Sequence, residues 1–367
     1  MTGQRTGSIL TPDGWVSGRI TFDERITAID GDPVRRPAPP YILPGFIDLH
    51  VHGGAGADMM EGEQAIRRAA ALHARHGTTA LLATTVTAPL AEIVAAAAAT
   101  AAVMAAPGPG EARVLGLHLE GPFLNPQRLG AQPPFALGAD PEAFAAMAAH
   151  APVRVVTIAP ECDPDGRLAA AVRAAGAKAQ IGHSLCDYAC ARQHLLEGWG
   201  VTHLYNATSA FSHRASGLTG AALAHADYAE IIPDLIHVDA GGILAAHRAI
   251  PHLYAVTDAT AGAGMPDGEY RLGSHRVVKR DGAMRLADGT LAGSSLTMDR
   301  ALVNLVSLGL ALDDVVRRLS TYPADWLGMS DLGRLAPGAY ADLVELDEGL
   351  AVKAVVIGGR AREDRGR

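Results

Sequence analysis

The stretch FIDLHVHGG (residues 46–54) places two histidines inside an apolar run that is typical of a buried β-strand. Side chains alternate between the two faces of a strand, so His50 and His52 point the same way, roughly 6–7 Å apart along it. Two imidazoles at this spacing suit two ligands of one metal centre. The alternative, a pair of hydrogen-bonded core histidines, would bury two polar rings side by side without a shared purpose. The pattern therefore favours a metal site.

More residues of metal-binding type occur near the ends of other apolar runs. Imidazole nitrogens combined with a carboxylate suit Zn²⁺, Fe²⁺, Mn²⁺ or Co²⁺, whereas Ca²⁺ and Mg²⁺ prefer oxygen ligands. An accessible site of this kind leaves a coordination position for water, and a nearby aspartate then predicts metal-assisted hydrolysis. The residues are Glu120 in LHLEGP, His183 in IGHS, His203 in VTHLYNA, His237 in IIPDLIHV and Asp258 in VTDAT.

Each of these residues also has a structural explanation. Glu120 could form a buried ion pair, and His183 and His203 could be ordinary polar strand ends. Asp258 could cap a helix, because TDAT is good capping chemistry. The functional interpretation depends on the whole set and not on any one member.

Short apolar runs alternate regularly with alanine-rich helical stretches from about residue 42 onward. Helical patterns such as 62–77, 165–176 and 187–199 separate the runs. Eight strand–helix units predict an α/β fold with a closed, TIM-like (β/α)8 barrel, and an open doubly wound sheet is the alternative. In a barrel the C-terminal strand ends meet at one rim, where the polar residues fall. The expected strands are 42–53, 78–86, 113–121, 153–161, 178–185, 201–207, 231–238 and 253–259.

The two ends of the chain differ from the middle. Residues 8–43 and 331–362 carry Gly, Asp and Pro turns and short β patterns. We expect them to pair into one small β domain, with 1–43 and 331–367 forming that domain and 44–330 the catalytic barrel. The tail 361–367 is expected to be disordered.

Composition excludes several classes of function. The 367 residues are 49% hydrophobic, which is ample for a large core. A net charge of −8 with only three lysines leaves no basic stripe for nucleic acid. The apolar run 94–106 is shorter than a membrane span, and the first residues lack the apolar core of a signal peptide. Neither nucleic acid nor a membrane is expected as a partner.

Three cysteines also bear on location. Cys162, Cys186 and Cys190 cannot all pair with one another, which fits a reducing compartment, so a cytoplasmic protein is expected. The spacing of His183, Cys186 and Cys190 could form a second metal site. Helical spacing inside an apolar helix makes packing the better interpretation of the two cysteines.

Eight stretches match a known family in order and at compatible spacing. They are LPGFIDLHVHGG (43–54), GLHLEGPFLNPQRLGAQPP (116–134), IGHS (181–184), VTHLYNATSAFSHRASGLTGAAL (201–223), IHVD (236–239), AVTDAT (255–260), DGTLAGSSLTMDRALVNLV (288–306) and GRLAPGAYADLVELD (333–347). With these motifs the chain resembles the amidohydrolase superfamily and, within it, the N-acetylglucosamine-6-phosphate deacetylases. The resemblance implies a barrel with a small β-sandwich domain built from both termini. It also implies a metal-dependent hydrolase of a linear amide, which converts N-acetylglucosamine 6-phosphate to glucosamine 6-phosphate and acetate.

The resemblance also implies roles for the polar residues. Glu120, His183 and His203 would hold the main metal, with Glu120 in place of the carbamylated lysine of many superfamily members. His50 and His52 would be available for a second ion, so one or two ions per subunit are expected, zinc first and iron, manganese or cobalt as alternatives. The metal lowers the pKa of its bound water toward ~7. Asp258 would take the proton of the attacking water and pass it to the leaving amine. The family also suggests a homodimer, with the option of a residue from one subunit reaching the other's site.

Substrate contacts follow from the same resemblance. Ala131 and Gln132 match positions near the acetyl group, and His237 with the LAG turn (Leu291, Ala292 and Gly293) matches positions that line the sugar. Asn206, Ala207 and Arg214 match the phosphate site, where an arginine fork suits a phosphate dianion. The alternative for Arg214 is an ordinary surface charge.

Two departures from the family pattern concern the sugar more than the reaction. Many relatives have His where this chain has Gln132, and the usual Asp-Gly-x-His motif is DLIH here, with Leu235 in place of Gly.

Three alternative functions stay open: a deacetylase of another N-acetylated sugar phosphate such as N-acetylgalactosamine 6-phosphate, a cyclic-amide hydrolase, and a non-catalytic binding or scaffold protein. Metal content and acetate release with different sugars would separate them.

Overall fold

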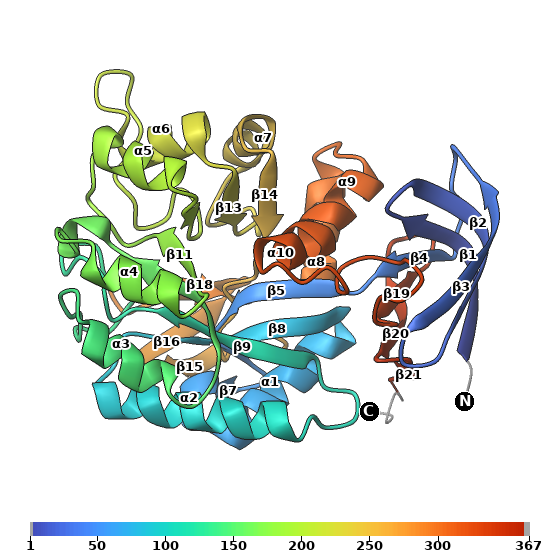
Figure 1. Ribbon diagram of the computed structural model, residues 1–367, viewed down its shortest axis with the longest axis horizontal. Helices are drawn as coiled ribbons and strands as arrows, with labels where there is room; N and C mark the ends of the chain where they lie inside the picture. Colours follow the sequence, from blue (N-terminus) through green and yellow to red (C-terminus); the bar gives the residue numbers. More distant parts are fainter. Residues whose placement is uncertain (1–2, 363–367) are drawn as a thin grey trace.

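The computed structural model describes residues 3–362 and contains a barrel of parallel strands beside a smaller β-rich domain (Figure 1). Most of the tail 361–367, for which disorder is expected, lies outside the described residues. In Figure 1 the barrel occupies the left and centre, and the β-rich domain built from the first and last strands lies on the right.

Parallel strands form the wall of the barrel. Six of them pair in the order β12-β11-β10-β9-β8-β5, and β13 pairs with β14. Strand β12 contacts β13, and a bridge between Val51 and Ala259 joins the end of β5 to the segment after β14, so the wall closes. The predicted eight-stranded barrel is confirmed. Its strands are β5 (Phe46–Val51), β8 (Thr78–Thr85), β9 (Arg113–Glu120), β10 (Val153–Ile158), β11 (Lys178–Ile181), β12 (Gly200–Val201), β13 (Tyr228–Ile231) and β14 (His252–Ala255).

Helices cover the outside of the barrel. Figure 1 shows α1, α2 and α3 below the strands and α5, α6 and α7 above them. Carboxylates begin several of these helices: Asp140, Asp187 and Asp239 each accept a backbone N–H of the first turn, which satisfies a donor that the helix cannot. Within residues 3–362, no helix is long and apolar enough to cross a membrane. The helices are α1 (Glu63–Arg75), α2 (Leu90–Ala105), α3 (Pro141–Ala148), α4 (Arg167–Ala174), α5 (Tyr188–Leu196), α6 (Gly217–His225), α7 (Ala240–Ala249), α8 (Met298–Ser307), α9 (Leu312–Val316) and α10 (Tyr322–Trp326), with short turns η1 (Met59–Glu61), η2 (Pro160–Cys162) and the π-helical η3 (Arg317–Thr321).

The seventh strand differs from its predicted place. The sequence predicts 231–238, but β13 spans Tyr228–Ile231 and only one residue overlaps. Pro233 lacks the N–H that a central strand needs, and the Asp234 carboxylate accepts the N–H groups of Ile236 and His237 to close a turn. His237 therefore lies in the loop after β13 and not at a strand end.

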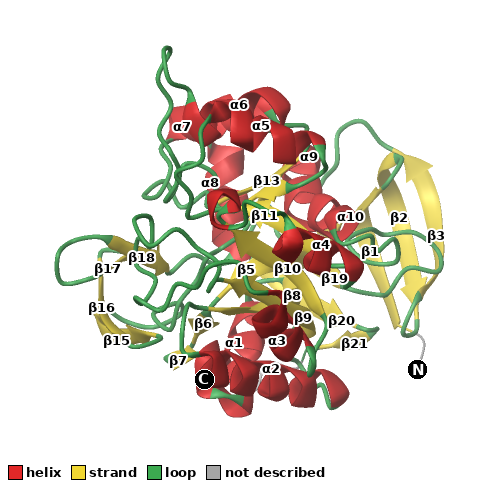
Figure 2. Ribbon diagram, turned by 60° about the vertical axis from the view of Figure 1, so that its left-hand side comes forward, coloured by secondary structure: helices red, strands yellow, loops and turns green. Residues whose placement is uncertain are grey.

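A small antiparallel sheet follows the eighth barrel strand, and the sequence did not predict it. Figure 2 shows its strands beside the barrel, surrounded by loops. A parallel bridge between Ala259 and Ser294 connects its last strand to the segment after β14, which brings that strand to the barrel mouth. The sheet consists of β15 (Gly268–Leu272), β16 (His275–Arg280), β17 (Ala283–Arg285) and β18 (Leu291–Ser294), and a separate hairpin pairs β6 (Gly53–Gly54) with β7 (Ala57–Asp58).

The second domain combines both ends of the chain, as the composition shift predicts. Its strands run in the order β21-β20-β19-β4-β1-β2-β3. Side chains from early and late strands share one core, which includes Ile20, Phe22, Leu343 and Val356, and this sheet-rich unit is consistent with the small sandwich that the family resemblance implies. The boundaries at residues 43/44 and 330/331 stay a prediction. The strands are β1 (Gly3–Thr11), β2 (Gly14–Phe22), β3 (Ile26–Pro33), β4 (Tyr41–Pro44), β19 (Leu343–Leu346), β20 (Val352–Ile357) and β21 (Arg360–Ala361).

Candidate metal centre and active site

Glu120, the last residue of β9, lies at the centre of a group of histidines at the barrel mouth. Its Oε1 atom is 2.8 Å from His203 Nε2, 3.0 Å from His183 Nε2 and 3.5 Å from His50 Nε2. Its Oε2 atom is 3.1 Å from His52 Nε2. One carboxylate thus faces four imidazoles that come from three different parts of the barrel wall.

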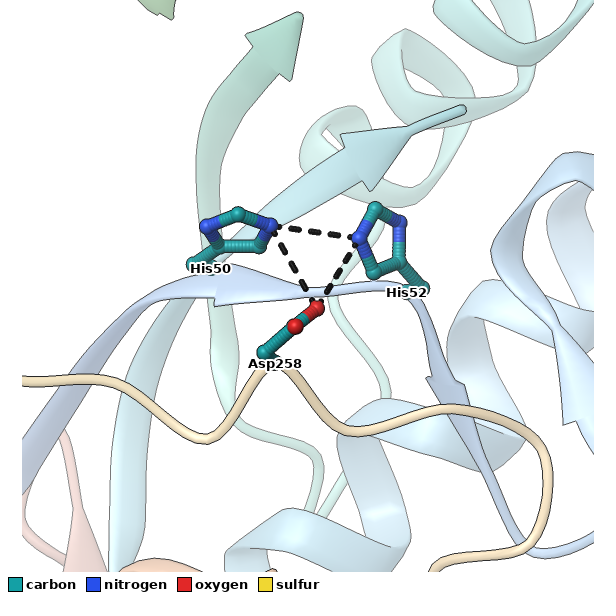
Figure 3. Close-up of side chains that lie close together, drawn as sticks. All are labelled: His50, His52 and Asp258. Carbon is teal, nitrogen blue, oxygen red and sulfur yellow. Dashed lines mark hydrogen bonds and ion pairs between the residues drawn. The ribbon is translucent and has the colours of Figure 1, made fainter. Parts of the chain in front are cut away.

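Asp258 faces His50 of β5 and His52, the first residue after that strand. Its Oδ1 atom is 3.2 Å from His52 Nε2 and 3.5 Å from His50 Nε2, and the two Nε2 atoms are 3.2 Å apart. Figure 3 shows the rings of His50 and His52 directed toward Asp258, which lies on the loop that faces them. As strand alternation predicts, His50 and His52 point to the same side.

These side chains form two groups that can each hold a metal ion. The ligand atoms of Glu120, His183 and His203 lie within 4.8 Å of one another, and so do those of His50, His52 and Asp258. Because the two oxygens of Glu120 face both groups, this carboxylate is placed to bridge them. A third cluster, His50 with His118 and Glu230, lies deeper in the barrel.

Three of the six residues have an uncommon backbone conformation. The φ angles are 47° at His183, 27° at His203 and 49° at Asp258, which lie in the left-handed region that non-glycine residues rarely adopt. Each residue follows the end of its strand by two or three positions, where the chain turns inward over the mouth. Such strain of about 1–3 kcal/mol per residue persists only where the surroundings hold it.

The surroundings of Asp258 show how one of these positions is held. Its N–H donates to the carbonyl oxygen of His50 at 2.8 Å, and its own carbonyl oxygen accepts the N–H of Ser294 at 2.7 Å. A Cβ on Gly293 would lie 2.8 Å from that carbonyl oxygen and 2.5 Å from Thr260 Cγ2. Gly293, with φ of 62°, therefore permits the close approach that fixes Asp258.

The buried carboxylates and imidazoles of the site shift one another's pKa values. Burial opposes ionisation of Glu120, but the charge of His50 and hydrogen bonds from His183 and His203 hold its pKa well below the ordinary value. Burial likewise opposes the charge of Asp258, and His50 and His52 bring its pKa below normal. Burial disfavours a charged His52, yet hydrogen bonds to Asp258 and Glu120 raise its pKa to about 9.

The buried carboxylates of the site lie against groups that can carry positive charge. Within the described residues, the ion pairs of Glu120, Asp258 and the nearby Glu230 run to imidazoles. Imidazole is neutral or carries one charge, whereas a divalent cation would satisfy two carboxylates at once. The donor set of four Nε2 atoms and carboxylate oxygens therefore fits a divalent transition metal.

A cavity of about 340 Å³ opens above the metal groups, which is within the usual range for a small-molecule site. Of the residues expected to form the site, most line this cavity. They are His52, Glu120, Ala131, Gln132, His183, His203, Asn206, Ala207, His237, Asp258, Leu291 and Gly293.

Three expected residues do not line the cavity. His50 and Ala292, the middle residue of LAG, are both fully buried. Arg214 is exposed, in the turn between Ser212 and Ala215, and its role in binding phosphate stays a prediction.

Gln132 contacts the metal-binding carboxylate directly. Its amide nitrogen donates to Glu120 Oε2, and its amide oxygen accepts the N–H of Thr87 at 2.7 Å. Because the Thr87 N–H fixes which end of the amide faces inward, the NH₂ group is directed into the cavity. Gln132 can therefore donate to a substrate oxygen but cannot carry charge there.

The DLIH motif has a left-handed backbone at Leu235, the position at which the usual motif has glycine. Leu235 has φ of 65°, a conformation that glycine adopts freely and leucine only with strain. Its side chain is 42% exposed and is not among the residues that line the cavity. His237 Nδ1 lies 2.7 Å from Asp234 Oδ2, which orients the ring of His237 toward the cavity.

The structure adds residues that sequence reasoning missed. Arg128 lines the cavity and brings a positive charge to it. Asp48 is fully buried, and its Oδ2 accepts from Thr257 Oγ1 at 2.5 Å, which ties β5 to the segment that carries Asp258. The period of two that placed His50 and His52 on one face also includes residue 48, so the sequence pattern could have identified Asp48. The pattern pointed less clearly to Glu230, because the expected strand began one residue after it.

Comparison with known proteins is consistent with this architecture. The model of the amidohydrolase family matches residues 41–362. An N-acetylgalactosamine-6-phosphate deacetylase of Escherichia coli O157:H7 is 37% identical over 97% of this chain and 98% of its own length. An N-acetylglucosamine-6-phosphate deacetylase of Lysinibacillus sphaericus is 35% identical over 88% of this chain and 85% of its own.

Solved structures of N-acetylglucosamine-6-phosphate deacetylases are also similar to this chain. That of N-acetylglucosamine-6-phosphate deacetylase from Thermotoga maritima has a TM-score of 0.90 at 29% identity and covers 99% of both chains. A variant of the Mycobacterium smegmatis enzyme, in complex with N-acetyl-D-glucosamine-6-phosphate, has a TM-score of 0.88 at 33% identity and covers 98% of both chains.

The chain belongs to the amidohydrolase family, whose members are metal-dependent. It is a hydrolase that acts on an amide bond, and the resemblance to N-acetylglucosamine-6-phosphate deacetylases is confirmed.

Proposed function

We propose that this chain removes the acetyl group of N-acetylglucosamine 6-phosphate and releases acetate and glucosamine 6-phosphate. The observation that carries the proposal is the convergence of Glu120, four histidines and Asp258 beneath one cavity, in a chain whose relatives at 33–37% identity are sugar-phosphate deacetylases. A small N-acetylated sugar phosphate fits a cavity of about 340 Å³.

The metal would be held by Glu120, His183 and His203, with His50, His52 and Asp258 available for a second ion. We propose zinc, which favours the nitrogen and oxygen donors present here, with iron, manganese and cobalt as alternatives. When bound, the ion supplies Lewis acidity that polarises the substrate carbonyl and makes water acidic near neutral pH.

Asp258 would act as the general base and then as the general acid. It would accept the proton of the attacking water and deliver it to the amine nitrogen as the C–N bond breaks. Its Oδ1 atom faces the metal groups, and two backbone hydrogen bonds fix its position, so little reorganisation is needed. Gln132 would direct an N–H of its amide to the acetyl oxygen.

Residues farther from the metals would recognise the sugar and its phosphate. Asn206 and Ala207 line the cavity together with His237, Leu291 and Gly293. Arg214 stays a candidate for the phosphate because of its place in the family motif. The support for Arg128 comes from the structure, since its guanidinium-bearing chain lines the cavity.

The 4-epimer, N-acetylgalactosamine 6-phosphate, is a second candidate substrate. A relative that is 37% identical over 97% of this chain carries the name of a deacetylase for that sugar. The two sugars differ only in the orientation of one hydroxyl, so the same metal centre and Asp258 would serve either.

We also propose a homodimer in the cytoplasm. The family resemblance supports the dimer. Three free cysteines, Cys162, Cys186 and Cys190, support a reducing compartment.

An acetate-release assay with purified, zinc-loaded protein tests the function. We expect turnover of N-acetylglucosamine 6-phosphate, loss of activity after chelation, and recovery on adding zinc. Parallel assays with the galactosamine epimer and with unphosphorylated N-acetylglucosamine rank the substrates. Absence of acetate release from both sugar phosphates by fully metal-loaded protein would contradict the proposal.

A further inference from the structure

A fully buried carboxylate, Glu230 of β13, lies beneath the metal groups and outside the cavity lining. Its Oε2 atom is 2.9 Å from His50 Nδ1. The same oxygen accepts the backbone N–H of His203 at 3.1 Å. One oxygen atom therefore contacts a ligand of each metal group, through a ring in one case and through the backbone in the other.

The contact with His50 determines which ring nitrogen is available to a metal. A carboxylate is an acceptor, so the proton of a neutral His50 lies on Nδ1 and Nε2 keeps its lone pair. Figure 3 shows the second ring nitrogen of His50 directed away from His52 and Asp258, while Nε2 faces them. Glu230 thus holds both the tautomer and the orientation that a metal ligand needs.

The other imidazoles are held less strongly. His183 Nδ1 donates to the carbonyl oxygen of Arg128 at 2.8 Å, which fixes its tautomer without a charge. Within residues 3–362, the Nδ1 atoms of His52 and His203 have no hydrogen-bond partner. Each metal group therefore contains one histidine whose Nδ1 is held by a hydrogen bond. His183 is held by a backbone carbonyl group, and His50 is held by a carboxylate.

Glu230 is itself held by a buried polar layer that crosses the barrel. With its amide oriented to satisfy both ends, Gln180 donates to Glu230 Oε1 at 3.0 Å and accepts from Tyr254 at 2.6 Å and from the Trp326 indole at 3.2 Å. Gln180, Tyr254 and Glu230 are fully buried. This support leaves Glu230 little freedom to turn away from His50.

We propose that Glu230 is the positioning residue of the second metal site: it holds His50 in the tautomer that presents Nε2, and it ties that ring to the backbone of His203 in the main site. The inference rests on the metal centre of the proposed function. It concerns metal uptake, however, and not the identity of the sugar. Loss of such an outer partner of a metal-binding histidine weakens metal affinity by about 10–100-fold.

The test is a calorimetric titration of the chelator-treated full chain with Co²⁺, with no substrate present. We expect two ions per chain in the wild type. Glu230→Gln loses the charge that makes the His50 ring a stronger ligand, and its amide can turn an N–H instead of an oxygen toward Nδ1, so we expect one site with unchanged affinity and one weakened about 10–100-fold. The visible absorption of bound Co²⁺ should lose the component that appears with the second ion in the wild type.

Thr157→Val provides the matched control. Thr157 is fully buried in the same polar layer, but its hydroxyl contacts His118 and Thr202, not His50 or Glu230. We expect this variant to bind both ions as the wild type does. An equal loss in Thr157→Val and Glu230→Gln, a Glu230→Gln protein with two wild-type sites, or a wild type that takes up only one ion would each overturn the proposal.

A measurement on the wild type covers the case in which Glu230→Gln does not fold. Long-range ¹H–¹⁵N spectra of the zinc-loaded protein report which ring nitrogen of each histidine carries a proton. We expect His50 to be protonated at Nδ1, and protonation at Nε2 would refute the inference. Because none of these experiments uses a sugar, failure to release acetate would contradict the proposed function and leave the role of Glu230 standing.

Discussion

Replacing Asp258 by asparagine tests the proposed acid–base step most directly. Asn is nearly isosteric with Asp and is among the residues that tolerate a positive φ, here 49°. The two backbone hydrogen bonds of residue 258, to His50 and from Ser294, do not involve the side chain and should persist. We therefore expect the variant to fold with a melting temperature close to that of the wild type.

The size of the kinetic effect follows from the two proton transfers assigned to this carboxylate. General acid–base catalysis contributes about 10²–10⁴-fold to rate. Each factor of ten corresponds to about 1.36 kcal/mol, so the loss amounts to about 2.7–5.4 kcal/mol of barrier. An amine leaves poorly unless it is protonated, which places the expected fall in kcat in the upper part of this range.

The measurement is kcat for acetate release at saturating sugar phosphate, with metal content determined on the same samples. Metal content is essential because Asp258 Oδ1 lies 3.2 Å from His52 Nε2, within the second metal group. Asp239→Asn is the matched control, since Asp239 caps α7 on the surface and Asn caps equally well. A metal-loaded Asp258→Asn enzyme that keeps more than about a tenth of wild-type kcat would refute the assigned role.

Three further predictions follow from single contacts. Gly293→Ala should lower the free energy of unfolding by about 1–3 kcal/mol and reduce kcat, because the added Cβ meets Thr260 and the Asp258 carbonyl. Gly289→Ala, whose Cβ meets nothing within 4 Å, is its control in urea unfolding and acetate-release assays. Arg128→Ala should raise KM about 10–100-fold for the phosphorylated sugar and leave KM for the unphosphorylated sugar unchanged, and an equal rise for both would show that Arg128 does not bind phosphate. Burial lowers the pKa of His73 to about 4, so stability that is present above the ordinary value of 6.5 is lost as the pH falls toward 4. Urea unfolding should show about 2 kcal/mol of this loss between about pH 7.5 and 5, and His73→Gln, which cannot gain the proton, should remove it.

Sequence reasoning located the part of the site that lies inside regular strands or directly after one. His50 and His52 follow the period of two, and Glu120 ends β9, so alternation and strand order were enough to place them at one rim. The barrel was predictable for the same reason, because each strand is a short apolar run followed by a helical pattern. The terminal domain was visible as a change from helical patterns to short β patterns.

The residues that sequence reasoning missed lie where those rules stop. Glu230 is a charged residue inside a four-residue strand, and the run IIPDLIHV shifted the expected strand past it. The turn at Pro233 ends the strand early, and the pattern of apolar residues alone does not indicate this turn. Arg128 lies in the long loop between β9 and α3, where no periodicity predicts which side chains face the cavity.

The remaining ligands show why a site at the barrel mouth resists prediction from strand alternation. His183, His203 and Asp258 lie two or three residues beyond their strands, where the left-handed backbone and not the pleat determines side-chain direction. Their position depends on contacts with other strands: His203 N–H donates to Glu230, and Asp258 N–H donates to His50. Glu230 also contacts the His50 ring, so one buried carboxylate orients a ligand of one metal group and accepts a backbone N–H of the other. Contacts of this kind join residues far apart in the chain, and no periodicity within a single strand can reveal them.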